Sequence, residues 1–217
     1  MPWSLKFCHD KTMPLNALAP SHLIGPNAII QMIKAMEEGL GVNETLNFFI
    51  KSKLGHYISH PLMGRVHEQD VCLIHQRLIE TYGIDQAKQL TREAGLRTAD
   101  HLLKNRIPKL FGFFLRHLPT KLSIALLLRA ISNHPWTFVG SGKFSYQVFS
   151  TITIYIESNP ICKGILSTAP ICDYYAGTFE GLLKSLINAT VKVQEVGCEA
   201  RGDPVCSFRV SWLDRNP

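Results

Sequence analysis

Apolar residues recur at intervals of three and four through much of the first half of the chain, which is the pattern of amphipathic helices. In the stretch GPNAIIQMIKAMEEGLG the apolar positions form one stripe, and Pro26 suits the first turn of a helix. The same spacing predicts a helix over residues 68–82 that ends at Gly83, and another helix over residues 85–105. We therefore expect this half of the chain to be helical.

The most apolar part of the chain is RIPKLFGFFLRHLPTKLSIALLLRAI, residues 106–131. Pro108 and Pro119 interrupt it, so it predicts two short helices. Two interpretations stay open at this point. Either these helices face the core, or they form a basic, amphipathic surface that contacts a membrane or lines an apolar pocket.

From residue 134 onward, β-branched and aromatic residues alternate with polar ones. WTFVGSGKFSYQVFSTITIYIES predicts one or two strands, and GSGKF within it is interpreted as a hairpin turn. Residues 172–188 return to helical spacing. TVKVQEVGCEA and VCSFRVSW then predict two strands joined by the RGDP turn at residues 201–204. Helices followed by an antiparallel sheet with an inserted helix indicate an α+β fold.

Composition describes an ordinary globular protein. The chain has 217 residues, of which 46% are hydrophobic and 18% are charged, so it is long enough to bury a sizeable core. Residues 1–22 contain three prolines and no clear period, and we expect them to form a loosely attached N-terminal arm. Residues 23–217 are expected to form a single ligand-binding domain.

Charge and hydropathy exclude several classes of function. The net charge is +6, but no run of five basic residues occurs, which argues against nucleic-acid binding. The longest stretch without Lys, Arg, Asp or Glu, residues 12–33, is broken by prolines and is not expected to span a membrane. The N-terminus lacks the apolar core of a signal peptide, so we expect a cytoplasmic protein. In that reducing compartment, spaced cysteines indicate metal binding or chemistry more often than a disulfide.

Two cysteines of the predicted hairpin, Cys198 and Cys206, flank its turn and are expected to point to one side. Glu195 lies three residues before the first, and Cys172 opens the preceding helix. We expect Cys172, Glu195, Cys198 and Cys206 to hold a structural zinc ion, which prefers four such ligands. The spacing C-x7-C is not the tight C-x2-C zinc knuckle, so two buried thiols or a disulfide remain alternatives.

Several of these stretches resemble one protein family. EVGCEARGDPVCSFRV resembles the closing signature of the 4-vinyl reductase domain. GPNAI, EAGLRTADHLLKNRIPK and HPWTFVGSGKF resemble segments of the bacteriochlorophyll 4-vinyl reductase family, and the resemblance runs from about residue 23 to residue 212. It implies a helical layer on a twisted antiparallel sheet that encloses an apolar ligand chamber. The same fold is known from Golgi vesicle-tethering subunits and haem-based nitric-oxide sensors.

The resemblance also bears on the zinc site. Phenol-responsive transcription activators carry this domain with a zinc site whose pattern is Glu-x2-Cys-x7-Cys, with another cysteine a little over twenty residues upstream. Cys172, Glu195, Cys198 and Cys206 match that pattern. A closed, four-ligand zinc site of this kind would support the fold and would take no part in redox chemistry.

The family implies a role in chlorophyll or bacteriochlorophyll synthesis for photosynthesis, through reduction of the 8-vinyl (formerly 4-vinyl) group of a divinyl tetrapyrrole. Hydride transfer needs a nicotinamide or flavin, and the chain shows no G-x-G-x-x-G motif after a strand. Two functions stay open: an oxidoreductase that uses externally supplied NADPH, and a non-catalytic tetrapyrrole carrier or small-molecule sensor module. Expected partners are the tetrapyrrole and other enzymes of the pathway, while a homodimer and peripheral membrane contact are left undecided.

His134 and Trp136 are the predicted ligand contacts. An imidazole nitrogen can coordinate the magnesium of a tetrapyrrole, and an indole can stack on the ring. The alternative is that His134 merely turns the chain before Pro135 and that Trp136 packs in the core.

Overall fold

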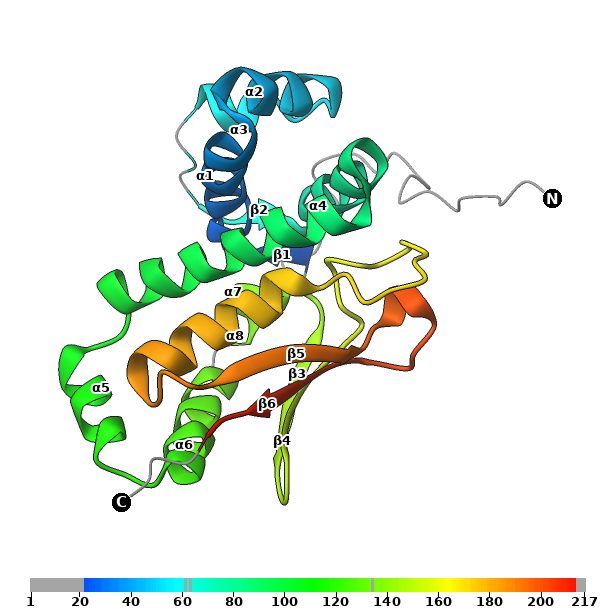
Figure 1. Cartoon of the computed structure of the whole chain (residues 1–217). Helices are drawn as coiled ribbons and strands as arrows, with labels where there is room; N and C mark the ends of the chain where they lie inside the picture. Colours follow the sequence, from blue (N-terminus) through cyan, green and yellow to red (C-terminus); the bar gives the residue numbers. More distant parts are fainter. Residues whose placement is uncertain (1–21, 61, 63, 134, 214–217) are drawn as a thin grey trace.

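The computed structural model describes residues 22–60, 62, 64–133 and 135–213. They form a helical layer packed on a twisted antiparallel sheet (Figure 1). The sheet has the strand order β3-β4-β6-β5, and every neighbouring pair is antiparallel. Its strands are β3 (Lys143–Val148), β4 (Ile152–Glu157), β5 (Lys192–Gly197) and β6 (Cys206–Ser211). The expected α+β fold is confirmed.

The helices and short elements fill the rest of the described chain. The helices are α1 (Asn27–Leu40), α2 (Val42–Lys51), α3 (His56–Ser59), α4 (Glu68–Asn105), α5 (Lys109–Arg116), α6 (Thr120–Ser132), α7 (Trp136–Val139) and α8 (Asp173–Leu186). A two-residue ladder pairs β1 (Leu23–Ile24) with β2 (Val66–His67), and a 3-10 helix, η3 (Glu199–Arg201), lies in the β5–β6 connection. Among the described helices, none is both long enough and apolar enough to cross a bilayer.

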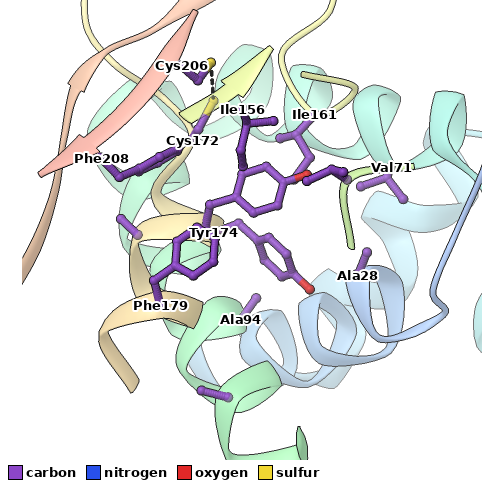
Figure 2. Packing of buried hydrophobic residues seen from close by; sticks show 14 of the residues in the cluster. Ala28, Val71, Ala94, Ile156, Ile161, Cys172, Tyr174, Phe179, Cys206 and Phe208 are labelled. Atoms are coloured by element: carbon purple, nitrogen blue, oxygen red, sulfur yellow. Dashed lines mark hydrogen bonds between the residues drawn. The ribbon is translucent and has the colours of Figure 1, made fainter. Parts of the chain in front are cut away.

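Helix α8 lies between the sheet and α4, and α1 to α3 lie on the other side of α4 (Figure 1). Glycines allow α4 and α8 to approach closely. A Cβ added at Gly95 would lie 2.1 Å from the carbonyl oxygen of Tyr174, and one at Gly177 would lie 2.4 Å from that of Arg92. The core between α8 and the sheet is aromatic: Tyr175, Phe179 and Phe208 pack with ring centroids about 6 Å apart. Figure 2 shows Phe179 and Phe208 in this core.

Most of the helices expected from the sequence are confirmed. Gly83 has φ +80° and separates two helical segments within α4, as the pattern predicts. Pro108 and Pro119 immediately precede α5 and α6. Helix α8 and the β5–β6 hairpin also lie where the sequence places them. Helices α2 and α3 were not predicted.

The prediction was wrong just before the sheet. Residues 136–139 form the short helix α7 rather than strand, because the chain turns at Pro135 and the amides of Phe138 and Val139 both donate to its carbonyl. The GSGKF stretch therefore connects α7 to β3 and is not a hairpin turn. It is held by the buried Glu68, whose carboxylate accepts hydrogen bonds from the amide and hydroxyl of Ser141 at 2.8 and 2.7 Å.

Candidate metal centre

Four buried thiols converge at one end of the sheet. Their sulfur atoms all lie within 4.8 Å of one another. Two come from the connection between β4 and α8, one within it and one at its last residue, and two come from the β5–β6 hairpin, at the residue after β5 and at the first residue of β6. In that order they are Cys162, Cys172, Cys198 and Cys206. Figure 2 shows Cys172 and Cys206 at the edge of the apolar core, near Ile156 and Ile161.

Three of the six sulfur–sulfur distances match those of a metal tetrahedron. The Sγ–Sγ distances are 3.6 Å for Cys162–Cys206, 3.7 Å for Cys172–Cys198 and 3.8 Å for Cys172–Cys206. A zinc–sulfur bond of about 2.3 Å would place the sulfurs of a regular tetrahedron about 3.8 Å apart. These distances are far longer than a disulfide bond, and the described cysteines are free thiols. The geometry therefore fits a tetrahedral metal ion.

The turn between β5 and β6 brings two of the thiols into place. Strand β5 has a register shift between Glu195 and Gly197, just before Cys198. The amide of Cys198 then donates to Asp203 Oδ2 at 2.8 Å, which closes the turn from the other side. Gly202 supplies the left-handed conformation at φ +95° that the turn requires. The chain thus returns with Cys206 as the first residue of β6.

Hydrogen-bond donors point at the sulfurs. Asn159 Nδ2 donates to Cys172 Sγ at 3.3 Å, and the amide of Glu199 donates to Cys206 Sγ at 3.3 Å. Asn159 is fully buried and is fixed by its own acceptor contact with the amide of Ile161. Donors of this kind favour thiolate over thiol and are typical of the shell around metal-bound cysteine.

Burial opposes thiolate formation unless a cation is present. Desolvation, followed by the neighbouring thiols, raises the pKa of the Cys172 thiol well above its ordinary value. Four thiolates packed this closely and out of water would repel one another strongly. A divalent cation reverses that balance, because metal binding releases the thiol protons.

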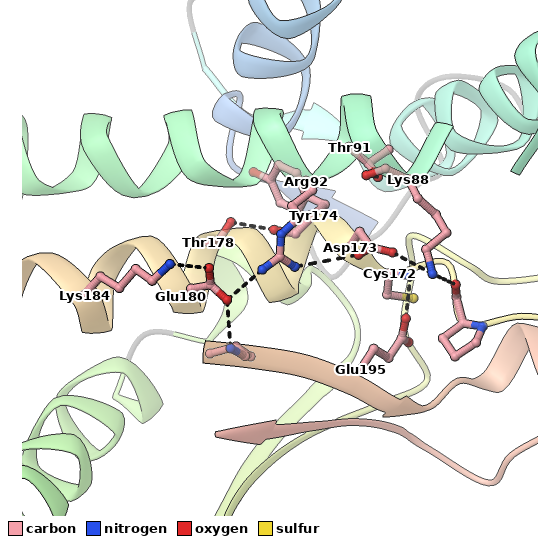
Figure 3. Close-up of polar contacts among 12 residues, drawn as sticks. Lys88, Thr91, Arg92, Cys172, Asp173, Tyr174, Thr178, Glu180, Lys184 and Glu195 are labelled. Carbon is pink, nitrogen blue, oxygen red and sulfur yellow. Dashed lines mark hydrogen bonds and ion pairs between the residues drawn. The ribbon is translucent and has the colours of Figure 1, made fainter. Parts of the chain in front are cut away.

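Glu195 lies beside the thiols but outside the group of four. Its Oε2 accepts a hydrogen bond from the backbone amide of Cys172 at 2.7 Å, a contact drawn in Figure 3. Its Oε1 is buried and has no hydrogen-bond partner among the described residues. Burial, and then the nearby Cys198, raises the pKa of Glu195 to about 10. The carboxyl group of Glu195 thus holds the backbone of Cys172, which carries one of the four thiols.

The structure therefore brings together three of the four residues predicted to bind zinc, with Glu195 against the backbone of Cys172. It adds Cys162. The sequence predicted Cys172 as the single ligand from outside the hairpin. The missing signal was strand pairing. Ile156 of β4 pairs with Cys206, so the loop that follows β4 begins next to that thiol.

Partly buried ion pairs fix the start of α8, and with it Cys172 (Figure 3). Lys88 of α4 lies 3.3 Å from Asp173, the first residue of α8, and also donates to the carbonyl of Pro170 at 2.9 Å. Further along, Glu180 accepts from Arg92 at 2.6 Å and from the amide of Val193 at 2.9 Å. These contacts tie α4, α8 and β5 together beside the thiol cluster.

The structure tests neither predicted ligand contact. His134 lies outside the described residues, and of Trp136 the structure describes only its place at the start of α7.

A small hollow lies between α4 and the segment before α8. Its lining residues are His75, Ile79, Ala87, Lys88, Thr91 and Ile171, and they leave no interior space for even a water-sized sphere. His75 is only 2% exposed, its Nε2 has no hydrogen-bond partner among the described residues, and burial lowers its pKa to about 3. Its ring meets Tyr174 edge-on at 6.2 Å. Pockets for organic ligands usually measure about 300–1,000 Å³, so a tetrapyrrole does not fit this hollow as it stands.

Comparison with known proteins identifies related chains. The family model of the 4-vinyl reductase domain matches residues 152–211, the segment that contains all four grouped cysteines. The bacteriochlorophyll synthase 23 kDa chain of Cereibacter sphaeroides is 37% identical over 202 residues, which cover 93% of this chain and 96% of the relative. The protein of the same name from Rhodobacter capsulatus is 35% identical over 185 residues, 85% of each chain.

Solved structures agree on the fold. An H-NOX protein from K. algicida superimposes with a TM-score of 0.61 at 8% identity, covering 89% of this chain and 99% of that one. Another H-NOX structure, from work on heme distortion, gives a TM-score of 0.57 at 14% identity over 89% and 96% of the two chains. At these identities the likeness concerns the fold alone.

Proposed function

We propose that this protein, which belongs to the family of the bacteriochlorophyll synthase 23 kDa chain, binds a divinyl tetrapyrrole precursor during bacteriochlorophyll synthesis. The observation that carries this proposal is identity along almost the whole chain, 37% over 93% of its length. The fold adds support, since it is shared with H-NOX proteins, one of which was studied for its distorted heme. Both the sequence identity and the shared fold favour a flat tetrapyrrole over other ligands.

Binding at the hollow beside His75 would require α4 and the segment before α8 to separate, because the lining side chains now leave no interior space for a ligand. Gly83 lies within α4, and its φ of +80° makes it the natural hinge for such a movement. His75 offers a neutral imidazole whose Nε2 has no hydrogen-bond partner in the described part of the chain, and neutral imidazole is the form that ligates magnesium or iron. His134 and Trp136 remain the other proposed contacts.

The role of the protein in vinyl reduction is the second part of the proposal. Conversion of the 8-vinyl to an ethyl group takes a hydride and a proton. NADPH would supply the hydride and water the proton. We favour a carrier that holds the pigment for other enzymes of the pathway, because the chain has no recognisable nucleotide-binding motif. The alternative is that the protein catalyses the reduction itself.

One experiment separates these roles. Purified protein is mixed with divinyl protochlorophyllide, with and without NADPH, and both the absorption spectrum and the product are followed. A shifted spectrum with unaltered pigment supports the carrier, and monovinyl product that needs NADPH supports the enzyme. A spectrum identical to that of free pigment contradicts both. His75→Gln and Trp136→Leu variants then test the two proposed contact regions separately.

We further propose that the thiol cluster holds one structural zinc ion through Cys162, Cys172, Cys198 and Cys206. The sulfur spacing and the two donors to sulfur support this set over the set with Glu195, whose oxygens lie outside the group of four ligand atoms. A zinc ion with four protein ligands is closed and redox-silent, so its contribution would be to join the β4–α8 connection to the β5–β6 hairpin. Vinyl reduction would not pass through it.

The ligand set is tested by zinc analysis and by the absorption spectrum of cobalt-substituted protein. Cys162→Ser is expected to lose tight zinc binding and to lower the sulfur-to-cobalt charge-transfer band by about one quarter, because one of four thiolates is gone. Glu195→Gln is expected to keep one zinc per chain and an unchanged band, since a glutamine oxygen can still accept from the Cys172 amide. The reverse result would place Glu195, and not Cys162, on the metal.

A further inference from the structure

Helix α5 carries an apolar row that faces solvent. Leu110, Phe113 and Phe114 are 82%, 65% and 59% exposed, and their spacing of three and four residues places them on one face of the helix. The opposite face is also apolar and is buried. Leu115 is fully buried, and a Cβ added at Gly112 would lie 3.0 Å from the Leu186 side chain. The outward row is therefore not needed to attach α5 to the protein.

The surroundings of this row are basic. Residues 101–156 contain seven Lys and Arg residues and no Asp or Glu. Four of these basic residues are exposed within or beside α5 and α6: Arg106, Arg116, Lys121 and Arg129. Leu122, at the start of α6, adds another side chain that is 47% exposed. We call Leu110, Phe113, Phe114 and these four cations the α5 surface.

A second exposed row provides a comparison within the same molecule. Val42, Leu46 and Ile50 of α2 are 64%, 39% and 58% exposed and also lie on one helical face. Residues 34–53, however, contain three glutamates and three lysines. The two rows thus have similar apolar content, but the α5 row lies in a basic region and the α2 row in a region of balanced charge. They are also far apart, with α2 on one side of α4 and α5 at the opposite edge of the molecule (Figure 1).

We propose that the α5 surface docks on an anionic membrane. A helix that presents large apolar side chains between basic residues binds at the lipid interface, with the apolar row in the acyl region and the cations at the headgroups. A second copy of this chain fits less well, because a symmetric contact would place the two basic surfaces against each other. This proposal does not depend on pigment binding, since none of its residues lines the hollow beside His75.

Vesicle flotation with the full chain tests the proposal. The protein is expected to float with vesicles of phosphatidylcholine and phosphatidylglycerol, and not with phosphatidylcholine alone. Raising the salt from about 0.1 M to 1 M is expected to release most of the bound protein, because the screening length falls from about 10 Å to about 3 Å. No pigment is present, so the result is independent of the carrier or enzyme question.

Paired variants locate the contact. Phe113→Ser with Phe114→Ser is expected to weaken binding at least about tenfold, whereas Val42→Ser with Ile50→Ser on α2 leaves it unchanged. Likewise Lys121→Glu is expected to weaken binding at least about fivefold, and Lys51→Glu on α2 is the matched control. All of these side chains are exposed, and circular dichroism checks that each variant is folded.

Three results would overturn the proposal. The first is wild-type protein that ignores anionic vesicles. The second is equal loss of binding in the α2 and α5 variants. The third is a wild-type dimer in sedimentation analysis that the Phe113→Ser, Phe114→Ser variant converts to monomer without lipid, which would make the α5 surface an interface between copies.

Discussion

Residues 152–211 and the helices α1 and α4 bury their side chains in different ways. Between α1 and α4 the buried groups are mainly aliphatic, such as Ile29, Met32 and Met36, and they follow a helical period that is visible in the sequence. In residues 152–211 four thiols, an asparagine and a carboxylate are buried together at the end of the sheet. The first region is held mainly by its apolar pattern, whereas the second depends on distant segments that meet, and we propose that a cation neutralises its thiols.

The largest expected effect comes from breaking the thiol cluster. Cys198→Ser removes one of the four proposed zinc ligands and should lower the free energy of unfolding by several kcal/mol. Metal binding in such sites is coupled directly to folding, and in small zinc domains it contributes about 10 kcal/mol or more. Zinc analysis measures the loss of metal, urea unfolding measures the loss of stability, and hydrogen exchange locates it in the chain. Exchange should accelerate in residues 152–211 first and leave the α1–α4 contact protected.

Cys72→Ser is the matched control for that variant. Cys72 is equally buried, at 2% exposed, but lies on α4 outside the cluster, and its sulfur contacts the carbonyl of Lys163 at 3.2 Å. A serine keeps that contact, so the loss should stay within about 1.5 kcal/mol with zinc unchanged. If the two serine variants lose similar stability and Cys198→Ser keeps its metal, the cluster is only a group of buried thiols.

Packing between the two regions gives the next largest effect. A methyl group at Gly95 would meet the carbonyl of Tyr174 at 2.1 Å and the amide of Thr178 at 2.9 Å. Both are backbone atoms of α8, so Gly95→Ala must push α4 and α8 apart, at a cost of about 3 kcal/mol in unfolding free energy. Zinc binding should be retained, because neither Gly95 nor the two α8 residues that it meets belong to the thiol cluster.

Gly55→Ala is the control for the packing change. Gly55 has an ordinary φ of −57°, and a methyl group there would lie 3.4 Å from Ile50, which is a normal contact. Its unfolding free energy should stay within about 1 kcal/mol of the wild type. Loss of zinc from Gly95→Ala would show instead that the α4–α8 contact and the thiol cluster are one cooperative unit.

The contrast between the α1–α4 region and residues 152–211 also explains what the sequence could predict. Helical periods, Gly83 and the two prolines locate α1, α4, α5 and α6, because the signal lies within each segment. The β5–β6 hairpin was equally local, and it placed Cys198 and Cys206 together. Cys162 could not be placed this way, since its position depends on β4 pairing with β6, a contact between segments about fifty residues apart.

Tertiary contacts also explain the misassigned segment. WTFV is apolar and β-branched enough to suggest a strand, but Pro135 begins a helical turn there. The carbonyl of Thr137 then accepts from the amide of Gly25 at 3.0 Å, and the carbonyl of Phe138 accepts from the Tyr175 hydroxyl at 2.9 Å. Both partners lie far away in sequence, so the local pattern contained no sign of them.

The smallest of these effects concerns His75, where α4 meets the segment that leads to the cluster. Burial lowers the folded-state pKa to about 3, against an ordinary value of 6.5. Between those two values the unfolded chain binds a proton that the folded chain does not, so stability falls as the pH drops below about 6.5. At pH 5 the cost is about 2 kcal/mol relative to pH 7.

Urea unfolding of the wild type and of His75→Leu at pH 7 and pH 5 measures this contribution. Acid also favours protonated thiols, but both chains share that loss, so the difference between them isolates the histidine. The wild type should lose about 2 kcal/mol more than His75→Leu over this interval. Equal losses in the two chains would mean that His75 is protonated in the folded state at pH 5, which requires water or an acceptor at its Nε2. In that case the hollow beside His75 would already be open to solvent, and pigment binding there would need less movement of α4.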